Sequence, residues 1–121
     1  MINMKDARLF AGSDGESHFD DVAVEFDSEP PHRFPVSEWQ SVERIRFLNF
    51  PPDLEPQMHR APARLLHILI TRSWAMQASD GETRHFKAGD VILVEDTTGK
   101  GHVTSITSEG ATLVARIQLP G

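Results

Sequence analysis

The chain has 121 residues, which fits one domain with one hydrophobic core, because a domain commonly has about 100 to 200 residues. Its 18 acidic and 12 basic residues give a net charge of −6, which repels a polyanion and excludes nucleic acid as an expected partner. There is no cysteine, which excludes disulfides, iron–sulfur clusters and cysteine nucleophiles. Any metal would have to be held by histidine, carboxylate or water.

The first six residues have neither a basic start nor an apolar stretch typical of a signal peptide. The longest apolar runs, such as Leu65 to Ile70, are far too short to span a bilayer. We therefore expect a cytoplasmic protein with no membrane partner.

The pattern of strands begins after a loop-rich segment at Ser28 to Ser37, where three prolines remove backbone donors. Ser41 to Phe50 mixes β-branched, aromatic and charged residues and predicts a strand that Pro51-Pro52 ends. Leu65 to Thr71 is a short apolar run without helix caps, and its length favours a buried strand over a helix.

A β-hairpin is predicted at Ser73 to Lys87. Ser73 to Ser79 and Glu82 to Lys87 are the two strands, and Asp80-Gly81 lies between them. This dipeptide favours a two-residue turn in which both central residues have positive φ.

Three more strands are predicted in the C-terminal third, at Val91 to Val94, His102 to Thr107 and Thr112 to Leu119. Turn residues separate these short strands at regular intervals, and no helix longer than one or two turns is needed. The pattern predicts an all-β single domain, residues 1–121, with an antiparallel sandwich or barrel.

The six histidines are the first candidates for a functional site, because imidazole binds divalent metals and changes charge near neutral pH. Three are set among polar or proline-rich neighbours and are interpreted as surface residues: His18, His32 and His85. His67 lies within an apolar run and is expected to be buried or to line a cavity. Strand alternation would place His59 on the same face as His67, unless Pro62 breaks the alternation.

Three features between Pro51 and Thr104 occur in a characteristic order: a histidine after a proline-rich entry, the Gly89-Asp90 strand start and the turn Gly99-Lys100-Gly101-His102. In this order of elements the sequence resembles a small single-domain cupin. Cupins are antiparallel jelly-roll barrels, also called double-stranded β-helices, in which two motifs place three histidines and a glutamate around a metal. The resemblance therefore implies a jelly roll with a central pocket.

The two cupin motifs match unequally. In the first motif, residues 53–72, only His59 occupies a ligand position, whereas Ala61 stands at the second histidine. In the second motif, residues 89–106, Gly89, Gly99 and His102 fit if the loop carries two extra residues. Of the metal site, His59 and His102 remain, with His67 as a third candidate ligand.

The resemblance implies a pocket for a small organic molecule such as a carboxylate, carbonyl compound or sugar. His59 and His102 are the predicted catalytic residues, and a divalent zinc, nickel, iron or manganese ion held by His59, His102 and His67 is the expected cofactor. The alternative is a metabolite-binding or sensing module without metal or turnover, and a dimerising scaffold is a third interpretation. A homodimer is expected, as in most cupins.

Three other features carry weaker hypotheses. Gly99-Lys100 fails as a phosphate loop, because Val94 and Gly101 replace the required glycine and Ser or Thr. Adjacent carboxylates Glu95-Asp96 point to opposite faces of a strand, so at most one can reach a pocket. Arg44 and Arg46 share one face of their strand: an interior pair would select an anionic ligand, whereas an exterior pair would be solvated.

Overall fold

The computed structural model describes residues 3–121, with side chains from Asp6 onward, and this part of the chain forms nine strands and no helix. None of these residues therefore forms a helix long and apolar enough to cross a membrane. The strands are β1 (Asn3–Ala11), β2 (Ser17–Glu25), β3 (Arg44–Phe50), β4 (Leu65–Leu69), β5 (Ser73–Ala78), β6 (Thr83–Lys87), β7 (Val91–Glu95), β8 (His102–Ile106) and β9 (Thr112–Gln118).

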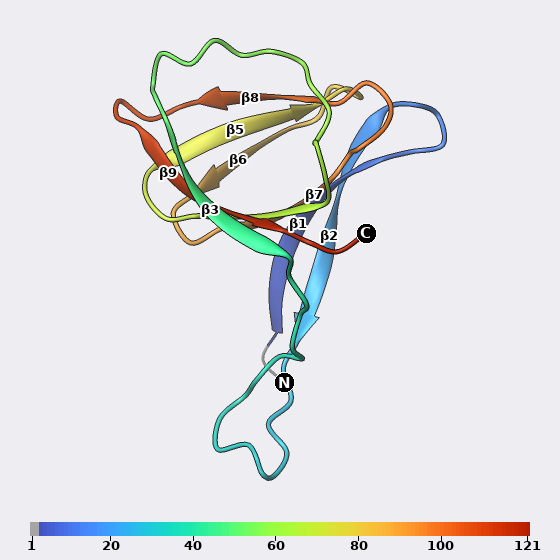
Figure 1. Ribbon diagram of the computed structural model, residues 1–121, viewed down its shortest axis with the longest axis vertical. Helices are drawn as coiled ribbons and strands as arrows, with labels where there is room; N and C mark the ends of the chain where they lie inside the picture. The colour runs from blue at the N-terminus through green and yellow to red at the C-terminus, as the bar shows by residue number, and fades with distance from the viewer. Residues whose placement is uncertain (1–2) are drawn as a thin grey trace.

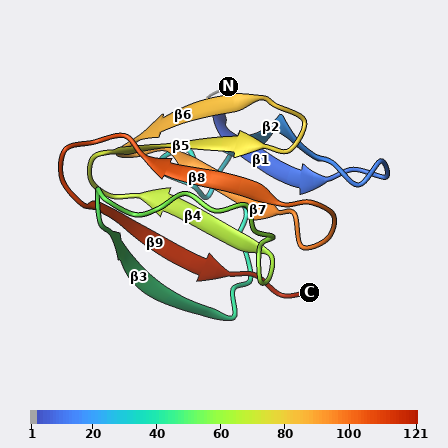
Figure 2. The ribbon, with the colours of Figure 1, turned by 90° about the horizontal axis from the view of Figure 1, so that it is seen from above.

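The strands form two sheets that face each other. The larger has the order β2-β1-β7-β4-β9-β3, and the smaller has the order β6-β5-β8. Figure 2 shows β5, β6 and β8 as one layer over β4, β9 and β3. The predicted all-β architecture is confirmed, and all pairs are antiparallel except β1 with β7.

The core lies between the sheets, because alternate residues of each strand face inward. β4 buries Leu65, His67 and Leu69 while the residues between them are half-buried. From the smaller sheet, Trp74 and Met76 of β5 are each only 1% exposed. The strands that sequence patterning predicts from residue 65 onward are therefore half-buried strands of a two-layer fold.

Strand ends differ from the predictions by a few residues, and β3 begins at Arg44 rather than Ser41. The Glu43 N–H still donates to the Gln118 carbonyl at 2.8 Å, so pairing with β9 extends one residue further. The segment between β2 and β3 is a loop, as the prolines predict, and in Figure 1 it extends away from the sheets.

The β5–β6 hairpin is confirmed, but its turn has three residues rather than the predicted two. The Ala78 N–H donates to the Glu82 carbonyl at 2.9 Å, and the Gly81 N–H donates to the Ala78 carbonyl at 3.0 Å. Gly81 has a positive φ of 102°, whereas Asp80 does not. A three-residue loop ending in a positive-φ glycine needs only one such residue, and Asp80 avoids the steric penalty of that conformation.

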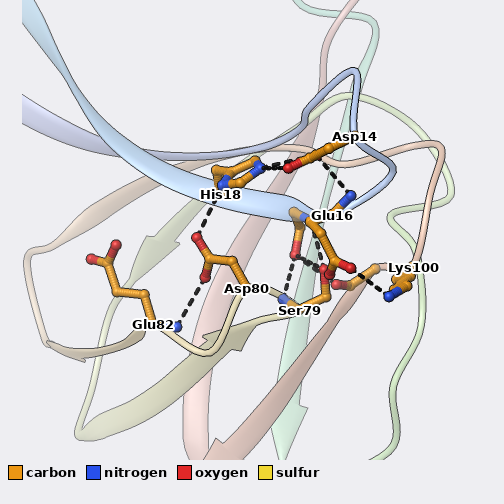
Figure 3. A network of polar contacts seen from close by, with 9 residues as sticks. Asp14, Glu16, His18, Ser79, Asp80, Glu82 and Lys100 are labelled. Carbon is orange, nitrogen blue, oxygen red and sulfur yellow. Dashed lines mark hydrogen bonds and ion pairs between the residues drawn. The ribbon is translucent and has the colours of Figure 1, made fainter.

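The β1–β2 hairpin was not predicted, although its turn has the same sequence as the β5–β6 turn. Ser-Asp-Gly-Glu occurs at residues 13–16 and again at 79–82, each time between two strands. Figure 3 shows the two turns side by side. The Ser17 N–H donates to Ser79 Oγ at 2.7 Å. This contact joins the N-terminal hairpin to the smaller sheet.

Candidate functional site

A small cavity of about 180 Å³ lies between the two sheets, under the long connection from β3 to β4. In Figure 1 this connection arches over the barrel on the side of β8. All three histidines predicted to form the site line the cavity, although they come from different segments. The full lining is Phe50, Leu54, Glu55, Gln57, His59, His67, Trp74, His102, Thr104 and Arg116.

His59 and His102 are held together by the backbone. The His59 N–H donates to the His102 carbonyl and the His102 N–H donates to the His59 carbonyl, both at 2.9 Å. Their ring centroids are 4.6 Å apart. Gly101, with φ of 84°, allows this approach, because a Cβ at position 101 would lie 2.2 Å from the His59 carbonyl oxygen.

A buried carboxylate orients His102. His102 is 3% exposed, and its Nδ1 lies 2.5 Å from Oδ2 of the fully buried Asp96. Glu95, the preceding residue, points the other way and pairs with Arg8 and Arg64 at 2.8 and 2.7 Å. Only one of the two adjacent carboxylates, Asp96, therefore contacts a site residue, as strand alternation predicts. Because Asp96 is bonded to Nδ1 of His102, Nε2 of that ring is free for other contacts.

His67 is also buried, with 4% of its surface exposed, and it is neutral. Its ring packs edge-on against Trp74, with ring centroids 5.5 Å apart. Burial, and after it the positive charge of Arg116, lowers the pKa of His67 from 6.5 to about 3. Arg116 Nε donates to His67 Nε2 at 3.1 Å, so the proton of the neutral ring is on Nδ1.

The donor set fits a bound metal only in part. His59 Nδ1 lies 3.0 Å from the Gln57 carbonyl, and His102 Nδ1 is bonded to Asp96, so each ring keeps Nε2 free, as in metal-ligating histidines. The Nε2 of His67 is already bonded to Arg116. Within residues 3–121, no three His, Asp or Glu side chains gather in metal-binding geometry. Since protein-held transition metals commonly have three or four ligands, this arrangement does not fit a tightly held ion.

The three remaining histidines lie outside the cavity. His18 bridges two turns, with Nε2 3.0 Å from Asp14 Oδ2 and Nδ1 3.0 Å from Asp80 Oδ2 (Figure 3). These hydrogen bonds, chiefly the one with Asp14, raise the pKa of His18. His32, in the β2–β3 loop, and His85, on β6, are exposed. Their interpretation as non-site residues is consistent with these positions.

Sequence reasoning did not find Arg116 as a cavity residue and did not pair Asp96 with His102. Strand alternation along β9, with Val114 buried, places Arg116 on the inward face, and this signal was present in the sequence. The Asp96–His102 pair depends on how the loop from residues 96 to 101 closes, which no local pattern specifies.

Comparison with protein-family models finds no match, and no curated protein matches the sequence. The solved structures that match this chain include the following two. Protein NMB1881 from Neisseria meningitidis is 15% identical with a TM-score of 0.47, over 70% of this chain and 88% of that chain.

The second is a putative ethanolamine utilization protein Q (EutQ) from Salmonella typhimurium LT2. It is 16% identical with a TM-score of 0.50, and the match covers 99% of this chain and 98% of that chain. At this identity the likeness concerns the fold alone. Together with the two facing β-sheets, it shows that the chain has an all-β jelly-roll fold.

Proposed function

We propose that the protein binds a small organic molecule in the cavity between its sheets and that His102 exchanges a proton with it. The observation that carries this proposal is the convergence of His59, His67, His102 and Arg116 on one cavity. A cavity of about 180 Å³ suits a metabolite of a few carbon atoms better than a drug-sized ligand, for which pockets of roughly 300 Å³ or more are usual.

The side of the cavity lined by His67 and Arg116 favours an oxygen-bearing ligand. The proton on His67 Nδ1 has no hydrogen-bond partner among the described residues, although the atom is buried. An unpaired buried donor is unfavourable, so a carbonyl or carboxylate oxygen that accepts this bond would be stabilised. The half-buried guanidinium of Arg116 adds positive charge beside it, and Trp74 and Phe50 provide an apolar wall.

His102 has the arrangement of a general acid or base. Asp96 accepts the Nδ1 hydrogen bond and thereby fixes the tautomer that leaves Nε2 as a proton acceptor. The carboxylate would also stabilise the imidazolium formed when Nε2 takes a proton. His59 lies at the exposed edge of the cavity, beside His102, where it would contact the ligand. Isomerisation, dehydration and decarboxylation each need such a proton transfer.

The second candidate is a binding or sensing module that holds the same metabolite without turnover. It is favoured by the first motif, in which Ala61 occupies a histidine position. The cupin resemblance also implies a divalent metal. The cavity offers such an ion only two free imidazole nitrogens, those of His59 and His102, which is fewer than a tightly held ion needs. No step of the proposal therefore depends on a metal.

A thermal-shift screen of small carboxylates, carbonyl compounds and sugars, with and without zinc, nickel, manganese and iron, tests the proposal. Ligands that bind the folded state raise its melting temperature. At a ligand concentration 100 times Kd, mass action adds about 2.7 kcal/mol to the free energy of unfolding. We expect His67→Leu to abolish the shift. His102→Asn should retain binding but lower turnover by about 100-fold or more if His102 is the acid or base.

The exposed His85→Asn variant is the matched control and should behave as the wild type in both assays. Turnover that survives in His102→Asn would leave only the binding module. A ligand shift that is the same in His67→Leu and in the wild type would contradict the cavity as the binding site. Metal analysis of untagged protein decides whether an ion accompanies the ligand.

A further inference from the structure

A second hollow, which we call the arginine groove, adjoins the histidine cavity and lies beside the first residues of β3. It has a volume of about 400 Å³ and is lined by Arg44, Ile45, Arg46, Pro62, Ala63, Leu65, Arg116 and Gln118. Arg116 lines both the groove and the histidine cavity. Arg116 therefore lies at the border between the two hollows.

Three guanidinium groups gather here because of strand register. Arg46 on β3 is directly opposite Arg116 on β9, and Arg44 is opposite Gln118. Like charges directly opposite each other in a sheet are destabilising. Burial and the charge of Arg46 together lower the pKa of Arg116, which reflects the same repulsion.

The repulsion is not relieved by the protein itself. Among side chains from residue 6 onward, no Asp or Glu forms an ion pair with Arg44, Arg46 or Arg116. Arg44 Nε donates to the neutral Gln118 at 2.9 Å, and Arg116 donates to the neutral His67 at 3.1 Å.

Elsewhere the chain pairs its strand arginines with carboxylates. Arg8 contacts Asp20 and Glu95, and Arg84 contacts Asp21 and Glu82. The nearest carboxylate that these contacts show, Glu43, accepts from Gln118 Nε2 at 3.1 Å and forms no ion pair with the three arginines. With 18 acidic residues in the sequence, three arginines together without an ion-paired carboxylate are a local exception. A bound anion would supply the missing negative charge.

We propose that the arginine groove binds an oxyanion group, either a phosphate monoester or one carboxylate of a dicarboxylate, of the ligand whose other end enters the histidine cavity. The planar forks of Arg44, Arg46 and Arg116 match the oxygens of either group. The assignment of the other end rests on the proposed function, whereas anion binding in the groove stands on its own.

Calorimetric titration with inorganic phosphate, succinate and acetate, each at the same ionic strength, measures the affinity of the groove for each anion. We expect phosphate or succinate to bind at least about tenfold more tightly than acetate, because several guanidinium groups act on one dianion. Phosphate binding without succinate binding indicates a phosphate ester as the ligand group, and the reverse indicates a dicarboxylate. Equal affinities for all three anions, or no binding of phosphate and succinate, overturn the proposal.

Arg46→Gln separates binding from a structural role. It removes the charge opposite Arg116, so the dianion affinity should fall about tenfold or more, while the melting temperature without ligand should not fall. Arg33→Gln removes an equal charge from the exposed β2–β3 loop, outside the groove, and should retain wild-type affinity. Equal affinities of Arg46→Gln and wild type overturn the proposal, as does an equal loss of affinity in Arg33→Gln.

His102→Asn distinguishes failure of this inference from failure of the proposed function. The variant alters the cavity but leaves the groove residues in place, so phosphate or succinate should still bind as tightly as in the wild type. If organic ligands bind in the cavity and no dianion binds in the groove, only the groove proposal fails. If the dianion binds and no ligand depends on the cavity histidines, the proposed function fails and the groove stands.

Discussion

His67 is a buried, titratable residue, and for this reason it makes the free energy of unfolding depend on pH. In the unfolded chain its pKa is near the ordinary value of about 6.5, whereas in the folded protein it is about 3. The folded state thus binds fewer protons than the unfolded state at pH values between the two. Its contribution to the free energy of unfolding is lost as the pH falls from 6.5 toward 3.

We expect this single residue to lower the free energy of unfolding by about 2 kcal/mol between pH 7 and pH 5. Urea unfolding of wild type and His67→Gln at the two pH values measures the contribution, because glutamine can still accept the Arg116 hydrogen bond but does not titrate. In His67→Gln, the difference between the free energies of unfolding at pH 7 and pH 5 should be smaller than in the wild type by about 2 kcal/mol. A control, the exposed His85→Gln, should retain the wild-type difference, and an unchanged difference in His67→Gln would contradict the buried neutral histidine.

At the scale of elements, the turn before β8 places His102 beside His59. The sequence predicts positive φ at glycines in the turn Gly99-Lys100-Gly101-His102, and both glycines have it, at 76° and 84°. The reason for Gly101 is clear only in three dimensions, because it is the His59 carbonyl that occupies the space of its side chain.

Gly101→Ala is therefore expected to destabilise the protein more than an alanine at another positive-φ glycine. Gly89 is the matched control, since its φ is 93° and nothing lies within 4 Å of the Cβ position. Backbone strain alone should make Gly89→Ala less stable by about 1–2 kcal/mol. Gly101→Ala adds a steric clash of about 1–3 kcal/mol and should also weaken ligand binding, because it separates His59 from His102. Equal melting temperatures and affinities of the two variants would show that the close contact is unimportant.

The N-terminal hairpin has a turn signal in the sequence but a weak strand pattern on either side of it. Asp14-Gly15 is the same dipeptide as Asp80-Gly81, and alternation along β2 buries Ser17 and Phe19 with less buried residues between them. The flanking residues are more charged than those around Asp80-Gly81, so the strand pattern is weaker there. Pairing of β1 with β7, far along the chain, is what places this hairpin in the sheet.

At the scale of the whole molecule, one edge of the larger sheet is exposed and apolar. β3 is the terminal strand, and its outward residues Ile45 and Phe47 are 56% and 63% exposed. An edge strand with apolar side chains favours pairing with another chain. The homodimer expected from the cupin resemblance would cover this edge.

Size-exclusion chromatography with light scattering at micromolar concentration checks the homodimer, for which we expect twice the monomer mass. Phe47→Lys should shift the protein to monomer, because a charge on the edge strand opposes pairing. Phe34→Lys, in the β2–β3 loop where Phe34 is 69% exposed, is the matched control and should remain dimeric. A wild-type monomer would contradict the expectation.

Local physical chemistry in the sequence determined the strands from β3 onward, the β5–β6 hairpin and the burial of His67, because alternation and turn residues act over a few positions. It also indicated His59 and His102 through the cupin resemblance. Only the tertiary structure decided that Asp96 orients His102, that Arg116 shares the cavity and that Arg46 faces Arg116. Each of these contacts depends on which strands pair and in what register, and register is set by the packing of the whole core.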